Sequence, residues 1–279
     1  MMASALAFSL MTVFVKVAGQ RLPSQEIVLA RALLSLGMSY ALLRRAGVAP
    51  WGRLRGLLLL RGFFGFAGLS CVFYAVTHLP IAEATVLQYL HPIFTALLAA
   101  LFLGERLRPG LALSVGLSLA GVVLVTRPAP FFAGAVLDPF AVGVAVAGAF
   151  LSGCAYVTVR RLASEEDPLV IVMYFPLVTV PAALPGAVAS WVWPNPVEWG
   201  ALVGVGLFAQ LGQVWLTRGM RHEPAARATA ISYLQVVFAA VWGLLFFGEK
   251  LSWPTAAGAG LVLAGTLMAA RTRRRLRRD

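Results

Sequence analysis

Ten long blocks of apolar residues follow one another along this chain, separated by short stretches that carry charge, proline or glycine. They lie near residues 1–19, 26–43, 56–77, 80–103, 110–126, 138–159, 168–190, 197–217, 224–247 and 253–270. About 20 predominantly apolar residues cross the roughly 30 Å of hydrocarbon in a bilayer, so the blocks have the length of membrane spans. With 60% hydrophobic and 12% charged residues, the chain leaves no room for a sizeable soluble domain. We therefore expect an all-α polytopic membrane protein with ten transmembrane helices.

The fourth and ninth blocks end in nearly the same sequence motif. LFLGERL at 101–107 recurs as LFFGEKL at 245–251, an offset of 144 residues. At this offset, residues 78–127 and 222–271 align without a gap and are identical at 21 of 50 positions. The identities include His, Pro, Tyr, Glu and Arg, which two apolar helices do not share by composition alone. We expect a five-helix repeat over 1–127, a second over 138–271 and a basic tail over 272–279.

The offset covers five blocks, an odd number, so the second repeat must enter the membrane inverted relative to the first. Gly104 and Gly248 should then lie at opposite faces of the membrane. In each motif we expect the glycine to end a helix and the charges after it to lie at the water interface. This structural interpretation is favoured over a catalytic or binding role for the motif.

The distribution of basic residues predicts the orientation. If the N-terminus is cytoplasmic, the inner connections and the tail carry 17 Lys and Arg residues, and the outer connections carry only Arg21, Arg127 and Lys250. Such an asymmetry follows the positive-inside rule and places both termini in the cytoplasm. The net charge of +12 is then a topology signal, and we expect no nucleic-acid partner.

The chain lacks the usual motifs of enzymes and metalloproteins. It contains no metal-ligand spacing, glycine-rich phosphate loop or nucleophile elbow. Cys71 and Cys154 lie inside apolar blocks, where they act as packing residues. We expect no catalytic residues, no metal and no cofactor.

Polar residues recur at helical spacing inside several blocks. The fourth block has Gln88, His91 and Thr95 at i, i+3 and i+7, and the eighth repeats this spacing with Gln210, Gln213 and Thr217. Either these side chains join helices through hydrogen bonds, or they line a cavity; as sets, the stripes favour a cavity. The predicted substrate-binding residues are Tyr74, Gln88, Tyr89, His91, Tyr156, Gln210, Gln213, Tyr233, Gln235 and Trp242.

Titrating groups deep in the spans are few. His91 and Lys16 are the candidates for a coupling or titrating role, and no carboxylate is expected at mid-span. Pro92 cannot donate a backbone hydrogen bond, so we expect a kink in the fourth span beside the polar stripe. An uncharged, aromatic and amide-rich lining favours amphipathic substrates over permanently charged ions.

These features together resemble the drug/metabolite transporter superfamily, EamA type. The resemblance rests on residues that occur in both halves: Pro80, Ala84, Thr85, Phe94, Ala96, Gly104, Glu105 and Gly121, then Pro224, Ala228, Thr229, Phe238, Ala240, Gly248, Glu249 and Gly265. Within the family, the chain is similar to YddG-like exporters of aromatic and other amino acids. The resemblance implies a central cavity lined by spans 1, 3, 4, 6, 8 and 9, alternating access between the halves, and a bacterial inner membrane.

We therefore expect a monomeric secondary transporter in the lipid bilayer that exports small metabolites, amino acids including aromatic ones, through a midplane cavity. The alternatives are a passive facilitator or channel, and an exporter of other metabolites or drugs. An intramembrane enzyme would need a convergent nucleophile, base or metal set. A non-transporting scaffold would lack an internal polar cavity.

Overall fold

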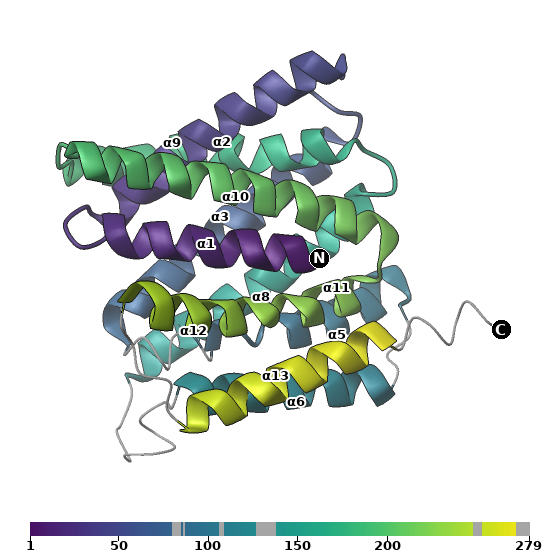
Figure 1. Cartoon of the computed structure of the whole chain (residues 1–279). Helices are drawn as coiled ribbons and strands as arrows, with labels where there is room; N and C mark the ends of the chain where they lie inside the picture. The colour runs from purple at the N-terminus through teal and green to yellow at the C-terminus, as the bar shows by residue number, and fades with distance from the viewer. Residues whose placement is uncertain (80–84, 86, 106–108, 127–137, 248–252, 272–279) are drawn as a thin grey trace. The chain divides into compact units, whose positions relative to one another are not determined.

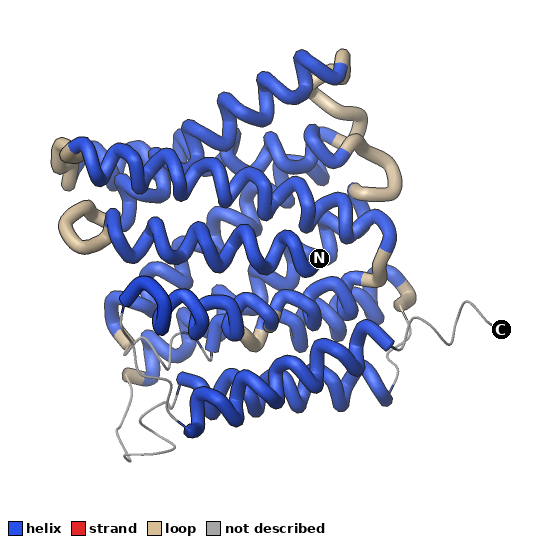
Figure 2. The backbone as a smooth tube through the Cα atoms, viewed as in Figure 1, coloured by secondary structure: helices blue, strands red, loops and turns tan. Residues whose placement is uncertain are grey.

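The computed structural model describes residues 1–79, 85, 87–105, 109–126, 138–247 and 253–271. Pro80, Arg127, the second glycine–glutamate motif at 248–251 and the tail at 272–279 lie outside the described residues. The described part of the chain forms helices and connecting loops, without strands (Figures 1 and 2). The helices are α1 (Met2–Ala18), α2 (Ser24–Ala46), α3 (Arg55–His78), α5 (His91–Leu103), α6 (Pro109–Thr126), α8 (Pro139–Leu162), α9 (Pro168–Ala189), α10 (Pro196–His222), α11 (Ala225–Ser232), α12 (Leu234–Phe247) and α13 (Trp253–Arg271).

These helices fall within or close to the ten apolar blocks. Among the described residues, six helical segments are long and apolar enough to cross a membrane, and four shorter apolar helices accompany them. Helices α11 and α12 together occupy the ninth block and are separated only at Tyr233. The protein is therefore an all-α polytopic membrane protein, as predicted.

Local sequence signals account for many helix ends. Proline is the first residue of α6, α8, α9 and α10, where its missing N–H costs no helical hydrogen bond. The side chain of Asp167 accepts a hydrogen bond from the backbone N–H of Leu169 at 2.8 Å and caps α9. Gly47 and Gly104 end α2 and α5 with φ of +65°, a left-handed conformation that glycine adopts without strain.

The chain divides into two compact units, each with helices from both repeats. Unit 1 consists mainly of residues 3–66 and 158–222, and unit 2 mainly of residues 67–157 and 223–279. Helices α1, α2, α9 and α10 belong to unit 1, and α5, α6, α11, α12 and α13 belong to unit 2. Helices α3 and α8 each contribute to both units.

In unit 1, the helices that correspond in the two repeats pack on each other. Helix α9 lies 144 positions after α2, and the two share an extensive contact. Gln25, at the start of α2, lies beside Gly186, late in α9, so the pair is antiparallel. At the crossing, the Arg31 guanidinium lies 5.5 Å from the centre of the Phe175 ring, and these two residues are themselves repeat mates.

Unit 2 contains the same arrangement in α6 and α13. The Ser114 hydroxyl donates to the Gly265 carbonyl at 2.7 Å, and a Cβ on Gly121 would lie 2.6 Å from the Gly258 carbonyl oxygen. Ser114 and Gly258 are repeat mates, and so are Gly121 and Gly265. If each residue is exchanged for its repeat mate, one contact becomes the other. This relation indicates a local pseudo-twofold axis. Mates that cross antiparallel in both units are the mark of an inverted five-plus-five repeat.

The glycine–glutamate motif also joins the two copies. Beyond the helix end at Gly104, the Glu105 carboxylate accepts hydrogen bonds from the backbone N–H of Ala225 at 3.0 and 3.1 Å. Ala225 is the first residue of α11, where a backbone donor has no helical partner and a negative charge is favoured. The motif therefore ends a helix in the first repeat and caps one in the second.

The close approach of α6 and α13 predicts the effect of a single methyl group. Gly265→Ala would place a Cβ 2.7 Å from the Ser114 carbonyl oxygen, so we expect a loss of about 1–3 kcal/mol in stability. Gly260→Ala, on the same helix with no atom within 4 Å of its Cβ, is the matched control and should not destabilise the protein, because alanine is the better helix former. Thermal unfolding of the purified protein in detergent checks this. Equal melting temperatures for the two variants would contradict the described contact.

Tyr233 should stabilise unit 2 through its hydroxyl group. That hydroxyl donates to the backbone carbonyl of its repeat mate Tyr89 at 2.9 Å in a buried environment. Tyr233→Phe removes the hydrogen bond and should cost about 0.5–1.5 kcal/mol, measured by thermal or denaturant unfolding. Tyr40→Phe removes a hydroxyl from a side chain that is 50% exposed, and it should leave stability unchanged.

Candidate functional site

Unit 2 contains two helix interruptions at corresponding positions of the repeats. Tyr89 and Leu90 form a turn directly before α5, and Tyr233 forms the turn between α11 and α12. The sequence predicts a kink at Pro92, and the structure instead starts α5 at His91, with the proline in its first turn. The counterpart of Pro92 is Val236, so the second interruption occurs without a proline. Interrupted helices expose backbone groups that a continuous helix would use internally.

The two tyrosines at the interruptions stack on each other. Their ring centroids are 5.5 Å apart with an interplanar angle of 24°. Both side chains are buried, and the Tyr233 hydroxyl donates to the Tyr89 carbonyl. The Tyr89 carbonyl lies in the turn before α5, and the Tyr233 hydroxyl takes the place of a backbone N–H donor there. The pair also packs with Val115, Val122 and Val262 in the apolar core of unit 2.

His91 lies beside this tyrosine pair. Its ring centroid is 5.2 Å from that of Tyr156 in a stacked arrangement and 6.0 Å from that of Tyr89. The imidazole Nδ1 is 3.0 Å from the Gln88 carbonyl oxygen. The side chain is only 7% exposed, and its Nε2 atom is buried without a hydrogen-bond partner among the described residues. Tyr89, His91, Tyr156 and Tyr233 thus form one cluster, which we call the aromatic cluster.

The other predicted site residues of unit 2 are placed differently. Tyr74 stacks on His78 at 3.9 Å and meets the Phe140 ring edge-on at 6.0 Å. The Trp242 ring is 5.7 Å from that of Phe246. The Gln88 side chain is exposed, although its carbonyl holds His91, and Gln235 is half-buried.

Three predicted residues belong to unit 1. Gln210 is buried, and its Nε2 donates to the Ser39 hydroxyl of α2 at 2.8 Å. Gln213 accepts a hydrogen bond from Arg61 Nη2 at 3.2 Å. Lys16 is exposed in the last turn of α1. Both glutamines thus connect α10 to helices of the first repeat, which is the helix-joining role that the spacing left open.

Sequence reasoning assigned no role to Phe175, which lies between two arginines of unit 1. Arg61 is 4% exposed, and its guanidinium lies 4.8 Å from the centre of the Phe175 ring, which also contacts Arg31. A guanidinium over an aromatic face is attracted by the negative π face, more strongly where water is excluded. The only sequence signal was the position of two arginines within apolar blocks, and nothing in it pointed to Phe175.

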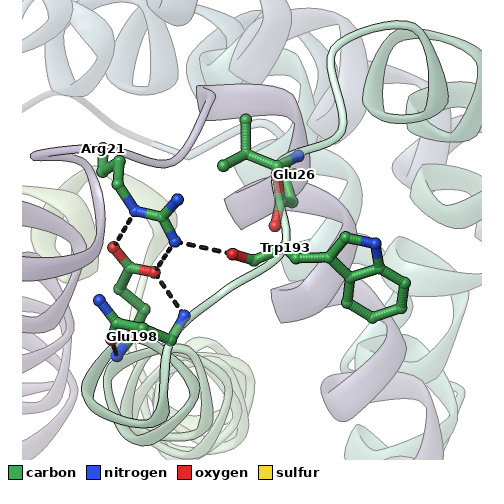
Figure 3. A network of polar contacts seen from close by, with 6 residues as sticks. Arg21, Glu26, Trp193 and Glu198 are labelled. Atoms are coloured by element: carbon green, nitrogen blue, oxygen red, sulfur yellow. Dashed lines mark hydrogen bonds and ion pairs between the residues drawn. The ribbon is translucent and has the colours of Figure 1, made fainter.

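A polar network joins two connections at one end of unit 1 (Figure 3). Arg21 donates from Nε to Glu198 at 2.8 Å and from Nη2 to the Trp193 carbonyl at 2.7 Å. Glu26 accepts from the backbone N–H of Val192 at 3.0 Å. The hydrogen bond with Glu198 raises the pKa of Arg21 above its ordinary value. The network ties the α1–α2 connection of the first repeat to the α9–α10 connection of the second.

The described residues contain no group of three or more His, Cys, Asp or Glu side chains that could hold a metal ion. They do contain the aromatic cluster at two interrupted helices, in which Tyr89, His91 and Tyr233 are buried, Tyr156 is half-buried, and one imidazole nitrogen has no described hydrogen-bond partner. Such an arrangement can hold a small molecule by ring contacts and hydrogen bonds.

Comparison with known proteins identifies relatives over nearly the full chain. The pseudopaline exporter CntI of Pseudomonas aeruginosa is 35% identical over 272 residues, which cover 97% of this chain and 94% of that protein. Human solute carrier family 35 member G1 is 27% identical over 285 residues, 96% of this chain and 76% of that protein. An uncharacterized transporter of Helicobacter pylori is 27% identical over 281 residues, 95% of this chain and 91% of that protein.

A solved crystal structure of a protein has the same fold, with a TM-score of 0.82, 23% identity and 98% of each chain covered. The model of the EamA-like transporter family matches this chain twice, over residues 1–127 and 139–271. These relatives are transporters rather than enzymes, so the family implies a small-molecule substrate and a lipid environment. From its sequence, its fold and its relatives, this multi-pass membrane protein belongs to the EamA-like transporter family.

Proposed function

We propose that this protein is a secondary transporter that exports small metabolites by alternating access, with amino acids, aromatic ones included, as its substrate class. The observation that carries the proposal is the aromatic cluster at two interrupted helices. In secondary transporters with inverted repeats, substrates bind near the bilayer midplane at discontinuous helices. The relationship to an exporter supports the direction of transport.

The chemistry of the cluster suits a substrate that has a ring and a polar end. Tyr89, Tyr156 and Tyr233, which stack on one another or on His91, would contact the substrate's ring, and His91 has a buried nitrogen. Tyr74 and Trp242 would add ring contacts, and the amides of Gln88 and Gln235 would bind the polar end. Gln210 and Gln213 of unit 1 are also predicted to bind substrate, although each already bonds to a helix of the first repeat. For these six residues the role stays a prediction from the sequence pattern, as does a titrating role for Lys16 or His91.

Two alternatives lead to different observations. A passive facilitator that works as an open channel would give flux that does not saturate and shows no counterflow. An exporter of other metabolites or drugs is favoured by the relationship to a pseudopaline exporter, and it would show itself in a thermal-shift screen across metabolite classes.

Transport of an aromatic amino acid tests the proposal directly. In proteoliposomes loaded with unlabelled phenylalanine, we expect saturable uptake of labelled phenylalanine by counterflow. Protein-free liposomes serve as the control, and liposomes with a known amino acid carrier show that the assay works. No uptake, while the known carrier responds, would exclude phenylalanine as a substrate and shift the proposal to another metabolite class.

Single replacements test the assigned residues. His91→Ala should lower counterflow by about tenfold or more while the protein still inserts and purifies, because it removes a hydrogen-bonding group from the site. His222→Ala changes an exposed histidine at the end of α10 and is the matched control. Flux in His91→Ala equal to that of the control would refute the assigned role.

We further propose a monomer in the bacterial inner membrane with both termini in the cytoplasm, as the basic residues predict. Gln20 and Ser164 are repeat mates in loops of unit 1, so an inverted repeat places them on opposite sides of the membrane. In a chain with Cys71 and Cys154 replaced by alanine, a membrane-impermeant maleimide should label Gln20→Cys but not Ser164→Cys in spheroplasts. Labelling of Ser164→Cys alone would reverse the orientation, and labelling of both would contradict the inversion.

A further inference from the structure

The hydrogen-bonding state of the His91 imidazole follows from the described polar contact of its ring. The Gln88 carbonyl, 3.0 Å from Nδ1, can only accept a hydrogen bond, so Nδ1 carries the proton. In a neutral imidazole, the other nitrogen is then a pure acceptor. The Thr95 hydroxyl donates to the His91 backbone carbonyl at 2.8 Å, and this bond joins the residue to the first turn of α5. The imidazole is thus held in one tautomer on a helix start.

The acceptor on Nε2 is buried and has no partner among the described residues. A buried polar atom without a partner costs free energy, so such an atom in a native structure calls for an explanation. The nearest described rings are those of Tyr156, with a centroid 5.2 Å from that of the imidazole, and Tyr89, at 6.0 Å. A donor group of a bound molecule would satisfy Nε2 and remove this cost on binding.

The donor class can be specified from the same residues. An unprotonated Nε2 repels the lone pairs of a carboxylate, whereas an ammonium group donates to it. Aromatic faces attract cations through the ring quadrupole, and the tyrosine rings flank the imidazole. The cluster is therefore built to accept a positively charged N–H donor and to reject an anion at this point.

We infer that His91 Nε2 accepts a hydrogen bond from an ammonium group of the substrate, and that the aromatic cluster selects metabolites with such a group. The inference deepens the proposed function, on which it rests, because it assigns one end of the amino acid to one atom of the protein. The second repeat has Gln235 at the position of His91, and an amide there can both donate and accept. A side-chain nitrogen that can only accept a hydrogen bond is thus present at this position in the first repeat and not in the second.

The test compares three probes that share a phenyl ring: phenylalanine, 2-phenylethylamine, which has only the ammonium, and 3-phenylpropionate, which has only the carboxylate. Binding of each to the purified full-length protein is measured by calorimetry or by competition with a labelled probe. We expect the wild type to bind phenylalanine and 2-phenylethylamine, and to bind 3-phenylpropionate at least about tenfold more weakly, as expected for a lost charge-assisted hydrogen bond.

Two variants of His91 separate hydrogen bonding from packing. His91→Phe keeps a ring beside Tyr156 but has no acceptor, so binding of both ammonium probes should weaken by about tenfold or more. His91→Gln keeps an acceptor and copies the second repeat, so it should restore most of that binding. His222→Phe, at an exposed position, is the control and should leave all affinities unchanged.

Each remaining outcome has a defined meaning. If His91→Phe keeps its affinity for the ammonium probes, or loses affinity for all three probes equally, the inference is wrong. If the wild type binds 2-phenylethylamine but neither binds nor transports phenylalanine, the amino acid proposal fails and the ammonium site stands. If phenylalanine is transported and 3-phenylpropionate competes better than 2-phenylethylamine, the proposed function stands and the inference fails. If no probe binds, both fail.

Discussion

Hydrocarbon offers no hydrogen-bond partner to a polypeptide backbone, and this constraint shapes the whole chain. A helix pairs its backbone N–H and C=O groups with each other, and the described chain is accordingly made of helices joined by loops. Apolar surfaces gain little by leaving lipid for one another, so helix pairs depend on close packing and on hydrogen bonds between helices. The contact of Gly121 with Gly258 and the Ser114–Gly265 hydrogen bond, both between α6 and α13, are examples of each.

The duplication gives these contacts their pattern. Because the second copy is inverted, corresponding helices meet antiparallel, and a contact made once is made again with the copies exchanged. Residues at such crossings face their own mates, as Tyr89 faces Tyr233 and Arg31 faces Phe175. Where the two copies keep the same residue, the contact holds the fold, as the tyrosine pair does.

Where the copies differ, the pseudo-symmetry is broken, and a site for an asymmetric molecule becomes possible. His91 and Gln235 occupy the same place in the two repeats and differ in what they can donate and accept. Tyr156, which stacks on His91, corresponds to Thr12 in the first repeat. A substrate with chemically different ends needs such differences, which an exact twofold arrangement would not provide.

Much of the fold could be predicted from sequence because its determinants are local. Block length and apolar composition predicted the helices, and the 144-residue offset predicted the inverted repeat without reference to any contact. Proline and glycine marked many of the helix ends that the structure shows, among them Pro168 and Gly104. The interruption at Tyr233 has no such local signal, since Val236 stands where the first copy has Pro92.

The candidate site was predictable only as a set of residue types. Helical spacing singled out His91, Gln210 and Gln213, but side chains that share a spacing need not share a partner. Gln210 bonds to Ser39 and Gln213 to Arg61, over separations of 171 and 152 residues that no periodicity encodes. By itself, therefore, the sequence determined the spans, the duplication and the inversion, because these depend on the polarity and order of neighbouring residues. Only the tertiary structure decided which polar groups are already paired and which nitrogen of His91 is left over, because pairing depends on distances between helices that are far apart in the chain.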